Sequence, residues 1–134
     1  MVLVTGAGGF AGSHLLEHLS GSAELAAWSR SDPSPELARL ARWQRVDILD
    51  REQVDAAIRE LRPDMIFHCA GLPHVAESWA DTAAPLAVNV LGTHRLIDAA
   101  ARIGRPCRIL VTGSAQVYAS SVEPIHEDLS LIHI

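Results

Sequence analysis

The glycines that follow the first apolar run are the residues whose type and spacing most clearly suggest chemistry. Residues 2–4 form a short aliphatic run, and the loop after it reads GAGGFAG over residues 6–12. Glycines at this spacing permit a tight turn and let backbone N–H groups approach a pyrophosphate at the positive end of a helix dipole. Glycines also serve simply to pack a helix on a strand, but a position after a strand and before a helix favours dinucleotide binding. The predicted cofactor-binding residues of this loop are Gly6, Gly8, Gly9, Phe10 and Gly12.

The residues after the second apolar run bear on which dinucleotide would bind. An acidic side chain at the end of the second strand accepts hydrogen bonds from the adenosine ribose of NAD. Ser29 and Arg30 occupy that place here. An arginine can pair with a 2′-phosphate through charge-assisted hydrogen bonds, so the sequence favours NADP, with NAD as the alternative. The competing interpretation is a solvated surface Arg30, with Asp32 as a displaced acidic residue.

The histidine and cysteine residues do not form a pattern typical of a metal site. His68, His74 and His94 lie on a predicted strand, loop and helix, without the spacing of metal ligands. Cys69 and Cys107 are too few and too far apart for a zinc site or a disulfide framework, and each lies in an apolar run. We expect no metal site and two reduced thiols in the core.

The composition is that of one globular domain. Of the 134 residues, 49% are hydrophobic and 20% are charged, and the net charge is −5. Nucleic-acid binding is disfavoured because the arginines are scattered and form no basic face. No apolar stretch approaches the ~20 residues of a membrane span, and the N-terminus has no basic region like that of a signal peptide. We therefore expect a cytoplasmic protein without nucleic-acid or membrane partners.

The elements that must position these residues follow from the apolar periodicity. The predicted strands are 2–4, 25–28, 44–46, 65–70 and 108–111, and the predicted helices are 10–18, 35–42, one from Asp50 to before Pro63, and 85–103. Asp50 and Gln53 have the spacing of a capping box. Strands that alternate with helices imply parallel β-α-β units, and hence a doubly wound α/β sheet with strand order 3-2-1-4-5.

Five stretches together resemble the extended short-chain dehydrogenase/reductase superfamily, in particular its nucleotide-sugar epimerase, dehydratase and reductase group. They are residues 5–12, 47–48 (DI), 68–71 (HCAG), 89–93 (NVLGT) and 113–118 (GSAQVY). The resemblance implies a Rossmann-type fold, an NAD(P) cofactor, a nucleotide-sugar substrate and a homodimeric parent protein. It also implies a function in which a hydride is transferred at a sugar carbon.

The resemblance also implies roles for single residues of the cofactor site. Asp47 and Ile48 would flank the adenine, and Ala70 and Gly71 would line the path to the nicotinamide. Asn89 would steady the cofactor region. A buried amide that only satisfies backbone groups is an equal alternative for Asn89.

Ser114 is the candidate catalytic residue. It stands where the family places the Ser or Thr that hydrogen-bonds the reacting sugar oxygen, beyond the carboxyl end of the fifth strand; an ordinary turn serine is the alternative. The family's 4,6-dehydratases carry an acidic pair next, but this chain has Ala115 and Gln116, which cannot transfer a proton near neutral pH. Epimerisation or keto-sugar reduction is therefore favoured. Residues 78–81 (SWAD) resemble a segment common in the branch of GDP-mannose dehydratases and GDP-4-keto-6-deoxymannose reductases, and this favours the reductase.

The family's catalytic Tyr and Lys, four residues apart on a later helix, have no counterpart here. The chain's one tyrosine is Tyr118, and all eleven of its basic residues are arginine. We therefore expect residues 1–128 to be the N-terminal part of the cofactor domain, truncated before the later strands, without the C-terminal substrate domain and without catalytic activity. The last six residues back-translate to a transposase-end adaptor, so 129–134 are expected to be a non-native tail. The fifth strand would then form a sheet edge.

Two other functions stay open from the sequence. A non-catalytic module that binds or senses NADP would share the same N-terminal half, although Ser114 argues against it. An oxidoreductase of the extended family that acts on a non-nucleotide substrate would also share it, because the C-terminal part normally forms the substrate pocket.

Overall fold

The computed structural model describes residues 1–72, 81–114, 118 and 124–126. Its elements in chain order are β1 (Val2–Thr5), α1 (Phe10–Leu19), β2 (Leu25–Ser29), α2 (Pro35–Ala38), β3 (Arg42–Arg45), α3 (Arg51–Leu61), β4 (Met65–His68), α5 (Ala83–Pro85), the π-helix η1 (Leu86–Gly92), α6 (Thr93–Ala101) and β5 (Arg108–Val111). Among the helices within these ranges, none combines the length and the apolar character needed to cross a membrane.

The strands form one parallel sheet in the order β3-β2-β1-β4-β5, which confirms the predicted topology. At the carboxyl end of the central strand β1, Thr5 is in register with Trp28 of β2 and His68 of β4. The loops that leave these three strands therefore start at the same edge of the sheet. This edge is where ligands of doubly wound folds bind.

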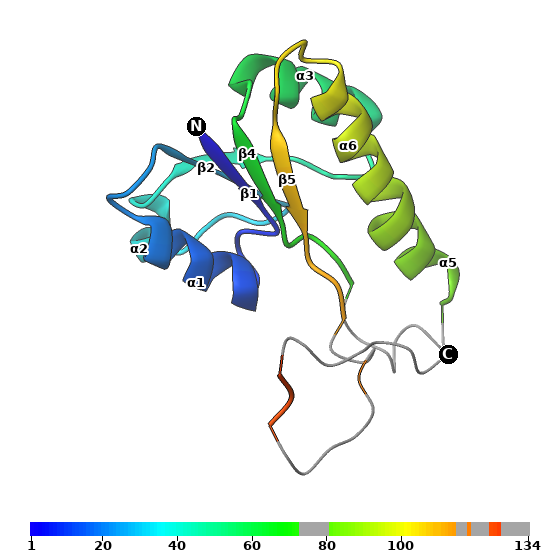
Figure 1. Ribbon diagram of the computed structural model, residues 1–134, viewed down its shortest axis with the longest axis horizontal. Helices are drawn as coiled ribbons and strands as arrows, with labels where there is room; N and C mark the ends of the chain where they lie inside the picture. The colour runs from blue at the N-terminus through cyan, green and yellow to red at the C-terminus, as the bar shows by residue number, and fades with distance from the viewer. Residues whose placement is uncertain (73–80, 115–117, 119–123, 127–134) are drawn as a thin grey trace.

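Helices cover both faces of the sheet, with α1 and α2 on one side and α3 and α6 on the other (Figure 1). Alternate residues of β1 contribute to the two layers, because successive strand side chains point to opposite faces. Leu3 packs in the cluster that contains Ile58 and Leu96, whereas Val4 packs in the cluster that contains Leu16. All five side chains are fully buried.

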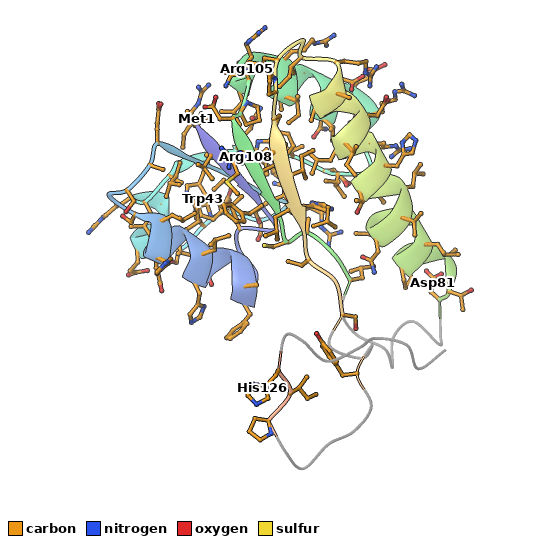
Figure 2. The ribbon with its side chains drawn as sticks, viewed as in Figure 1. Met1, Trp43, Asp81, Arg105, Arg108 and His126 are labelled. Carbon is orange, nitrogen blue, oxygen red and sulfur yellow. The ribbon has the colours of Figure 1, made fainter. Side chains whose placement is uncertain are left out.

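An ion cluster holds the opposite, amino edge of the sheet. The N-terminal amino group of Met1 donates to Asp64 Oδ2 at 2.7 Å, and Arg105 pairs with the other carboxylate oxygen. Figure 2 shows Met1 and Arg105 at the same end of the molecule, far from the carboxyl edge. The Met1 ammonium and the Arg105 guanidinium favour the charged form of Asp64, and the pKa of this carboxyl is lowered.

β1 and β2 each extend one residue beyond their predicted ends, and two strands, β3 and β4, differ from their predicted boundaries by two residues. The third strand is Arg42–Arg45 instead of residues 44–46, and α2 ends at Ala38. Arg42 is in register with Ala26, so the edge strand begins two residues earlier than its apolar character suggests. β4 ends at His68 instead of residue 70, since the chain then turns and the Ala70 N–H donates to Thr5 Oγ1 at 3.3 Å.

The predicted helix over 85–103 is a continuous helical segment with a π-helical part. α5, η1 and α6 follow one another without a break from Ala83 to Ala101 (Figure 1). Within it, the Thr93 hydroxyl donates to the carbonyl oxygen of Asn89 at 2.7 Å. Such π-helical turns are frequent at functional sites, and apolar spacing alone does not distinguish them from α-helix.

The predicted capping box of α3 is only half formed. Asp50 is the N-cap, and its Oδ1 accepts from the Gln53 N–H at 3.0 Å. The Gln53 side chain does not return the bond to Asp50; its Oε1 accepts from the Asp47 N–H at 3.2 Å. The helix ends before Pro63, as expected, with Arg62 in the left-handed conformation.

β5 lies at the edge of the sheet in the described part of the chain, as expected. It pairs with β4, and the side chains of Leu110 and Val111 are 47% and 46% exposed. An apolar strand that is uncovered in this way is a site where other chains can pair.

Candidate functional site

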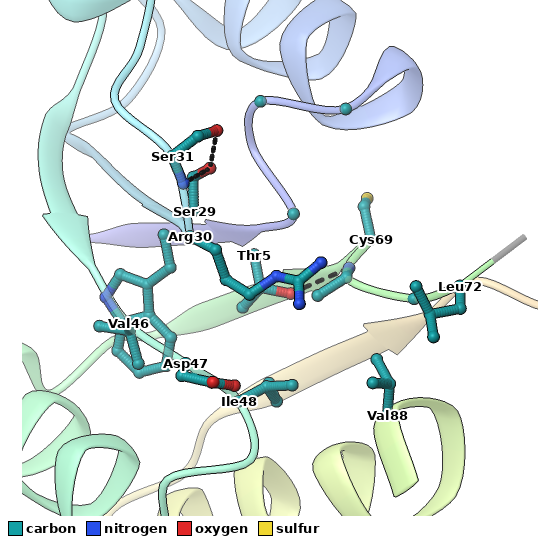
Figure 3. A pocket seen from close by; sticks show the side chains of 16 residues that line it. Thr5, Ser29, Arg30, Ser31, Val46, Asp47, Ile48, Cys69, Leu72 and Val88 are labelled. Carbon is teal, nitrogen blue, oxygen red and sulfur yellow. Dashed lines mark hydrogen bonds between the residues drawn. The ribbon is translucent and has the colours of Figure 1, made fainter. Parts of the chain in front are cut away.

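A cavity of about 510 Å³ opens at the carboxyl edge of the sheet. Figure 3 shows its wall, which the ends of β1, β2, β3 and β4 contribute with part of η1. The lining residues are Thr5, Gly6, Gly8, Gly9, Trp28, Ser29, Arg30, Ser31, Val46, Asp47, Ile48, Cys69, Ala70, Gly71, Leu72 and Val88. Nine of the thirteen predicted site residues are in this set.

The turn after β1 requires glycine for two separate reasons. Gly6 has a φ of +65°, and a Cβ placed on it would lie 2.6 Å from the backbone of Cys69 and Ala70. A Cβ on Gly12 would lie 2.4 Å from the Gly6 carbonyl oxygen. Gly6 thus makes the tight turn, and Gly12 lets α1 approach β1, as the glycine spacing predicts.

The start of α1 is built to receive an anion. Gly9 is the N-cap and has no side chain to cap the helix, and the first turn contains no acidic residue. The first helical hydrogen bond is donated by the Ser13 N–H to the Gly9 carbonyl at 3.0 Å, so the N–H groups of residues 10–12 precede it. Such N–H groups and the helix dipole together favour a phosphate. These features fit the pyrophosphate of a dinucleotide.

The end of β2 carries hydroxyl and guanidinium groups where NAD-binding proteins often have an acid. The Ser31 N–H donates to Ser29 Oγ at 3.1 Å, and the two hydroxyls are 3.2 Å apart. A Cβ on Gly8 would lie 3.2 Å from Ser29 Oγ, so the two loops are close. The Arg30 side chain extends over the cavity in Figure 3. This wall is suited to an anionic group.

The loop after β3 forms the facing wall. Ile48 is buried and lies against Gly92, whose Cβ would be 2.9 Å from Ile48 Cγ2. Asp47 is half-buried, and its Oδ1 accepts from the Leu49 N–H at 2.9 Å. Both residues line the cavity, on the side away from Ser29 and Ser31 (Figure 3).

Asn89 acts on the loop after β4 through its side-chain amide. Its Oδ1 accepts from the Leu72 N–H at 2.8 Å, and its Nδ2 donates to the Leu72 carbonyl at 3.2 Å. Asn89 does satisfy backbone groups, but it is exposed rather than buried. Asn89 does not line the cavity itself. It holds Leu72, which does line the cavity next to Gly71.

The sequence pattern matches a known family. The profile described as the NAD dependent epimerase/dehydratase family covers residues 2–133. The chain belongs to this family. It is 34% identical over 131 residues to the GDP-6-deoxy-D-mannose reductase of Pseudomonas aeruginosa, and 33% identical over 141 residues to the UDP-glucose 4-epimerase of Bacillus subtilis. These alignments cover 96% and 97% of this chain but 39% and 41% of those proteins.

Solved structures of the family agree in fold. MoeE5, solved in complex with UDP-glucose and NAD, is 34% identical with a TM-score of 0.77, and the match covers 95% of this chain and 40% of that one. The UDP-glucose 4-epimerase of Brucella ovis, in complex with NAD, is 31% identical with a TM-score of 0.79 and is covered to 39%. The chain therefore spans about two fifths of the length of these relatives.

Phe10, Gly12 and Ser114 are predicted site residues that lie outside the cavity wall. Phe10 is 84% exposed, and its ring centroid is 4.7 Å from that of His14. Gly12 acts through helix packing, as described above. Ser114 follows β5, is exposed and is not among the residues that line the cavity.

Several predictions from the family resemblance fall outside the described residues. These are Ala115, Gln116, His74, residues 78–80 and the tail 129–134. Asp81 is described, and its Oδ1 accepts from the N–H groups of Ala83 and Ala84 at 2.9 and 3.2 Å. Its observed role is thus at the start of a helix.

Cys69 and Cys107 are free cysteines, and they are half-buried instead of lying in the core. Cys69 lines the cavity, and burial raises the pKa of its thiol. Burial also raises the pKa of the Cys107 thiol, which reduces the thiolate fraction of both. Within the described ranges, no group of three or more His, Cys, Asp or Glu residues could hold a metal ion.

Sequence reasoning missed the polar residues at the base of the site. His68 is 1% exposed, with Thr5 Oγ1 2.7 Å from its Nδ1 and Thr93 Oγ1 2.9 Å from its Nε2. Burial lowers the pKa of this imidazole. A histidine inside an apolar strand does signal a hydrogen-bonded core group, but its partners on β1 and α6 depend on the tertiary fold.

Proposed function

We propose that this chain is the cofactor-binding part of an NADP-dependent nucleotide-sugar reductase or 4-epimerase, with a GDP-4-keto-6-deoxymannose reductase as the first choice. The observation that carries the proposal is the cavity in which the glycine loop, up to the N-cap Gly9 of α1, meets the Ser29–Ser31 segment. The likeness to the Pseudomonas reductase and to the epimerases supports the substrate class. We further propose that the whole protein is a cytoplasmic homodimer.

Each wall of the cavity would contact a different part of the dinucleotide. Gly8, Gly9 and the first turn of α1 would bind the pyrophosphate through backbone N–H groups. Asp47 and Ile48 would flank the adenine, and Ala70 and Gly71 would lie on the path to the nicotinamide. When bound, the cofactor supplies or accepts the hydride at the sugar carbon, and the protein orients it and excludes water.

The preference for NADP rests on the end of β2. The solved relatives named above contain NAD. In this chain, the Arg30 side chain extends over the cavity (Figure 3), and its sequence neighbours Ser29 and Ser31 add hydroxyl groups. This arrangement favours a ribose that carries a 2′-phosphate over an unphosphorylated ribose. Arg30 is exposed, so water weakens its pairing with the phosphate, and we expect a moderate preference rather than exclusive binding.

A fluorescence titration tests the proposal. Trp28 lines the cavity, so NADPH or NADH added to the chain should change its emission. We expect tighter binding of NADPH, and a loss of about tenfold in NADPH affinity but not in NADH affinity for Arg30→Gln, the usual scale of one charge-assisted hydrogen bond. Arg39→Gln, an exposed arginine at the C-cap of α2, is the matched control. Equal affinities for both dinucleotides in all three proteins would contradict NADP selectivity.

We propose that the 134-residue chain binds the cofactor without turnover. It contains no lysine and a single tyrosine, and Ser114 lies outside the cavity wall. We also propose that residues 1–128 are the native N-terminal part of a longer protein and that 129–134 are a foreign tail. Sequencing the parent gene past codon 128 tests this: a Tyr and a Lys four residues apart support the enzyme, and their absence supports a binding or sensing module.

A further inference from the structure

His68 links three elements at the base of the cavity. It ends β4, and its ring lies between Thr5 at the end of β1 and Thr93 at the start of α6. Both ring nitrogens have a hydroxyl partner within 2.9 Å, and 1% of the residue is exposed. His68 itself does not line the cavity.

The neighbouring hydrogen bonds determine where the ring proton lies. The Thr93 hydroxyl donates its one hydrogen to the Asn89 carbonyl at 2.7 Å, so Thr93 Oγ1 accepts from His68. The proton must therefore be on Nε2. Nδ1 is then an acceptor, and it takes the hydrogen of the Thr5 hydroxyl at 2.7 Å.

The same logic extends to the cavity wall. Thr5 Oγ1 accepts from the Ala70 N–H at 3.3 Å, and this bond starts a chain in which every donor points the same way. The chain runs from Ala70 through Thr5, His68 and Thr93 to the carbonyl of Asn89. Hydrogen bonds aligned in this manner polarise and strengthen one another.

The two ends of this series of hydrogen bonds fix residues 70–72, the loop that contributes to one wall of the cavity. Within residues 70–72, Ala70 is bonded to Thr5, and the Asn89 amide holds Leu72. The loop passes so close to Gly6 that a Cβ there would be 2.6 Å from the Ala70 nitrogen. Displacement of this loop would therefore change the space between residues 70–71 and the glycine turn after β1, both of which are predicted to contact the dinucleotide.

We propose that His68 is a positioning residue, a neutral imidazole with its proton fixed on Nε2 that sets dinucleotide affinity by holding residues 70–72 against β1. The inference rests on the proposed cofactor-binding function for its effect on affinity. The proton position and the loop position can be tested without any cofactor.

The first test is the tautomer of His68 in the chain alone, measured near neutral pH from the nitrogen chemical shifts of its ring by NMR. We expect a protonated Nε2 and an unprotonated Nδ1. A proton on Nδ1, or a fully protonated ring, would overturn the proposal.

The second test uses Thr93, which does not line the cavity. Thr93→Val leaves the Nε2–H of buried His68 without an acceptor, and we expect NADPH affinity to fall about tenfold, the scale of an unsatisfied buried donor. Thr93→Ser keeps the hydroxyl and should bind within about twofold of the native chain, since the hydrogen bond is retained. Equal affinity of the valine and serine variants would overturn the positioning role.

Backbone amide shifts separate this inference from the proposed function. In the absence of cofactor, Thr93→Val should move the amide signals of Ala70 and Leu72, and Thr93→Ser should leave them near their native positions. If the native chain binds no dinucleotide, the proposed function fails, but these shifts still decide whether His68 holds the loop. Unmoved amide signals of Ala70 and Leu72 in a folded Thr93→Val variant would overturn the positioning role of His68.

Discussion

Gly12 lies so close to Gly6 that a Cβ on Gly12 would be 2.4 Å from the Gly6 carbonyl oxygen. This contact packs the first turn of α1 against the turn after β1, and it thereby places the start of the helix next to the glycine loop that lines the cavity. We expect Gly12→Ala to lower the free energy of unfolding by about 2–3 kcal/mol, the cost of an overpacked contact. Chemical denaturation measures it. Gly113→Ala, at a glycine whose Cβ would meet no atom of the described residues within 4 Å, is the control and should be near neutral.

Gly8 should affect ligand binding more than folding. Its Cβ would meet only side-chain atoms of Ser29 and Ser31, at 3.2 Å and beyond, and it lines the cavity. We expect Gly8→Val to weaken dinucleotide binding about tenfold or more, the loss of one or two hydrogen bonds of ~1 kcal/mol each. Calorimetric titration with NADPH checks this. Binding as tight as that of the native chain would show that this loop does not hold the pyrophosphate.

Arg62 is a non-glycine residue in the left-handed conformation, with a φ of 46°, at the C-cap of α3. A left-handed backbone costs an L-residue roughly 1–2 kcal/mol, and a glycine at this position would avoid that cost. Part of the stability gained is lost again because glycine makes the unfolded chain more flexible. We therefore expect Arg62→Gly to raise the free energy of unfolding by up to about 1 kcal/mol. Arg59→Gly, inside the same helix, should instead lower it by about 1 kcal/mol. A loss of stability in both variants would contradict this explanation.

His68 predicts a pH dependence of stability. Burial lowers the pKa of its imidazole in the folded chain, below the ordinary value of 6.5. Between the folded pKa and 6.5, the unfolded chain binds more protons, so stability falls as pH falls through this window and is unaffected by His68 above it. Thermal unfolding from pH 8 to 5 should show the decrease. His68→Gln should flatten it; an equally steep decrease in this variant would assign the effect to other groups.

The topology of the sheet could be predicted from the sequence because most of its elements have a local sequence signal. The glycine loop marked the boundary between β1 and α1, and Asp50 marked the start of α3. The order of strands then followed from the alternation of strands and helices. Nine lining residues were found for a related reason, since they lie at or shortly after the ends of strands that share one edge.

The remaining features depend on contacts that have no local pattern. The edge strand β3 has the sequence RWQR, and its register is set by pairing with β2 rather than by apolar spacing. The bonds of His68 join residues 63 positions apart on one side and 25 on the other. Asn89 was expected to be buried or near the cofactor, yet it is exposed and bonded to Leu72. Ser114 is named by its motif, which does not fix its distance from the cavity.

The most direct test of the cofactor site is to map the backbone amide signals that move when NADPH is added to the chain. The structure predicts the largest changes at Gly8, Gly9 and residues 10–12, with further changes at Ser29, Asp47 and Ala70, and little change at the amino edge around Asp64. Saturable changes confined to these residues would support a dinucleotide site in the cavity. No change at NADPH concentrations in the millimolar range, or changes centred elsewhere, would contradict it.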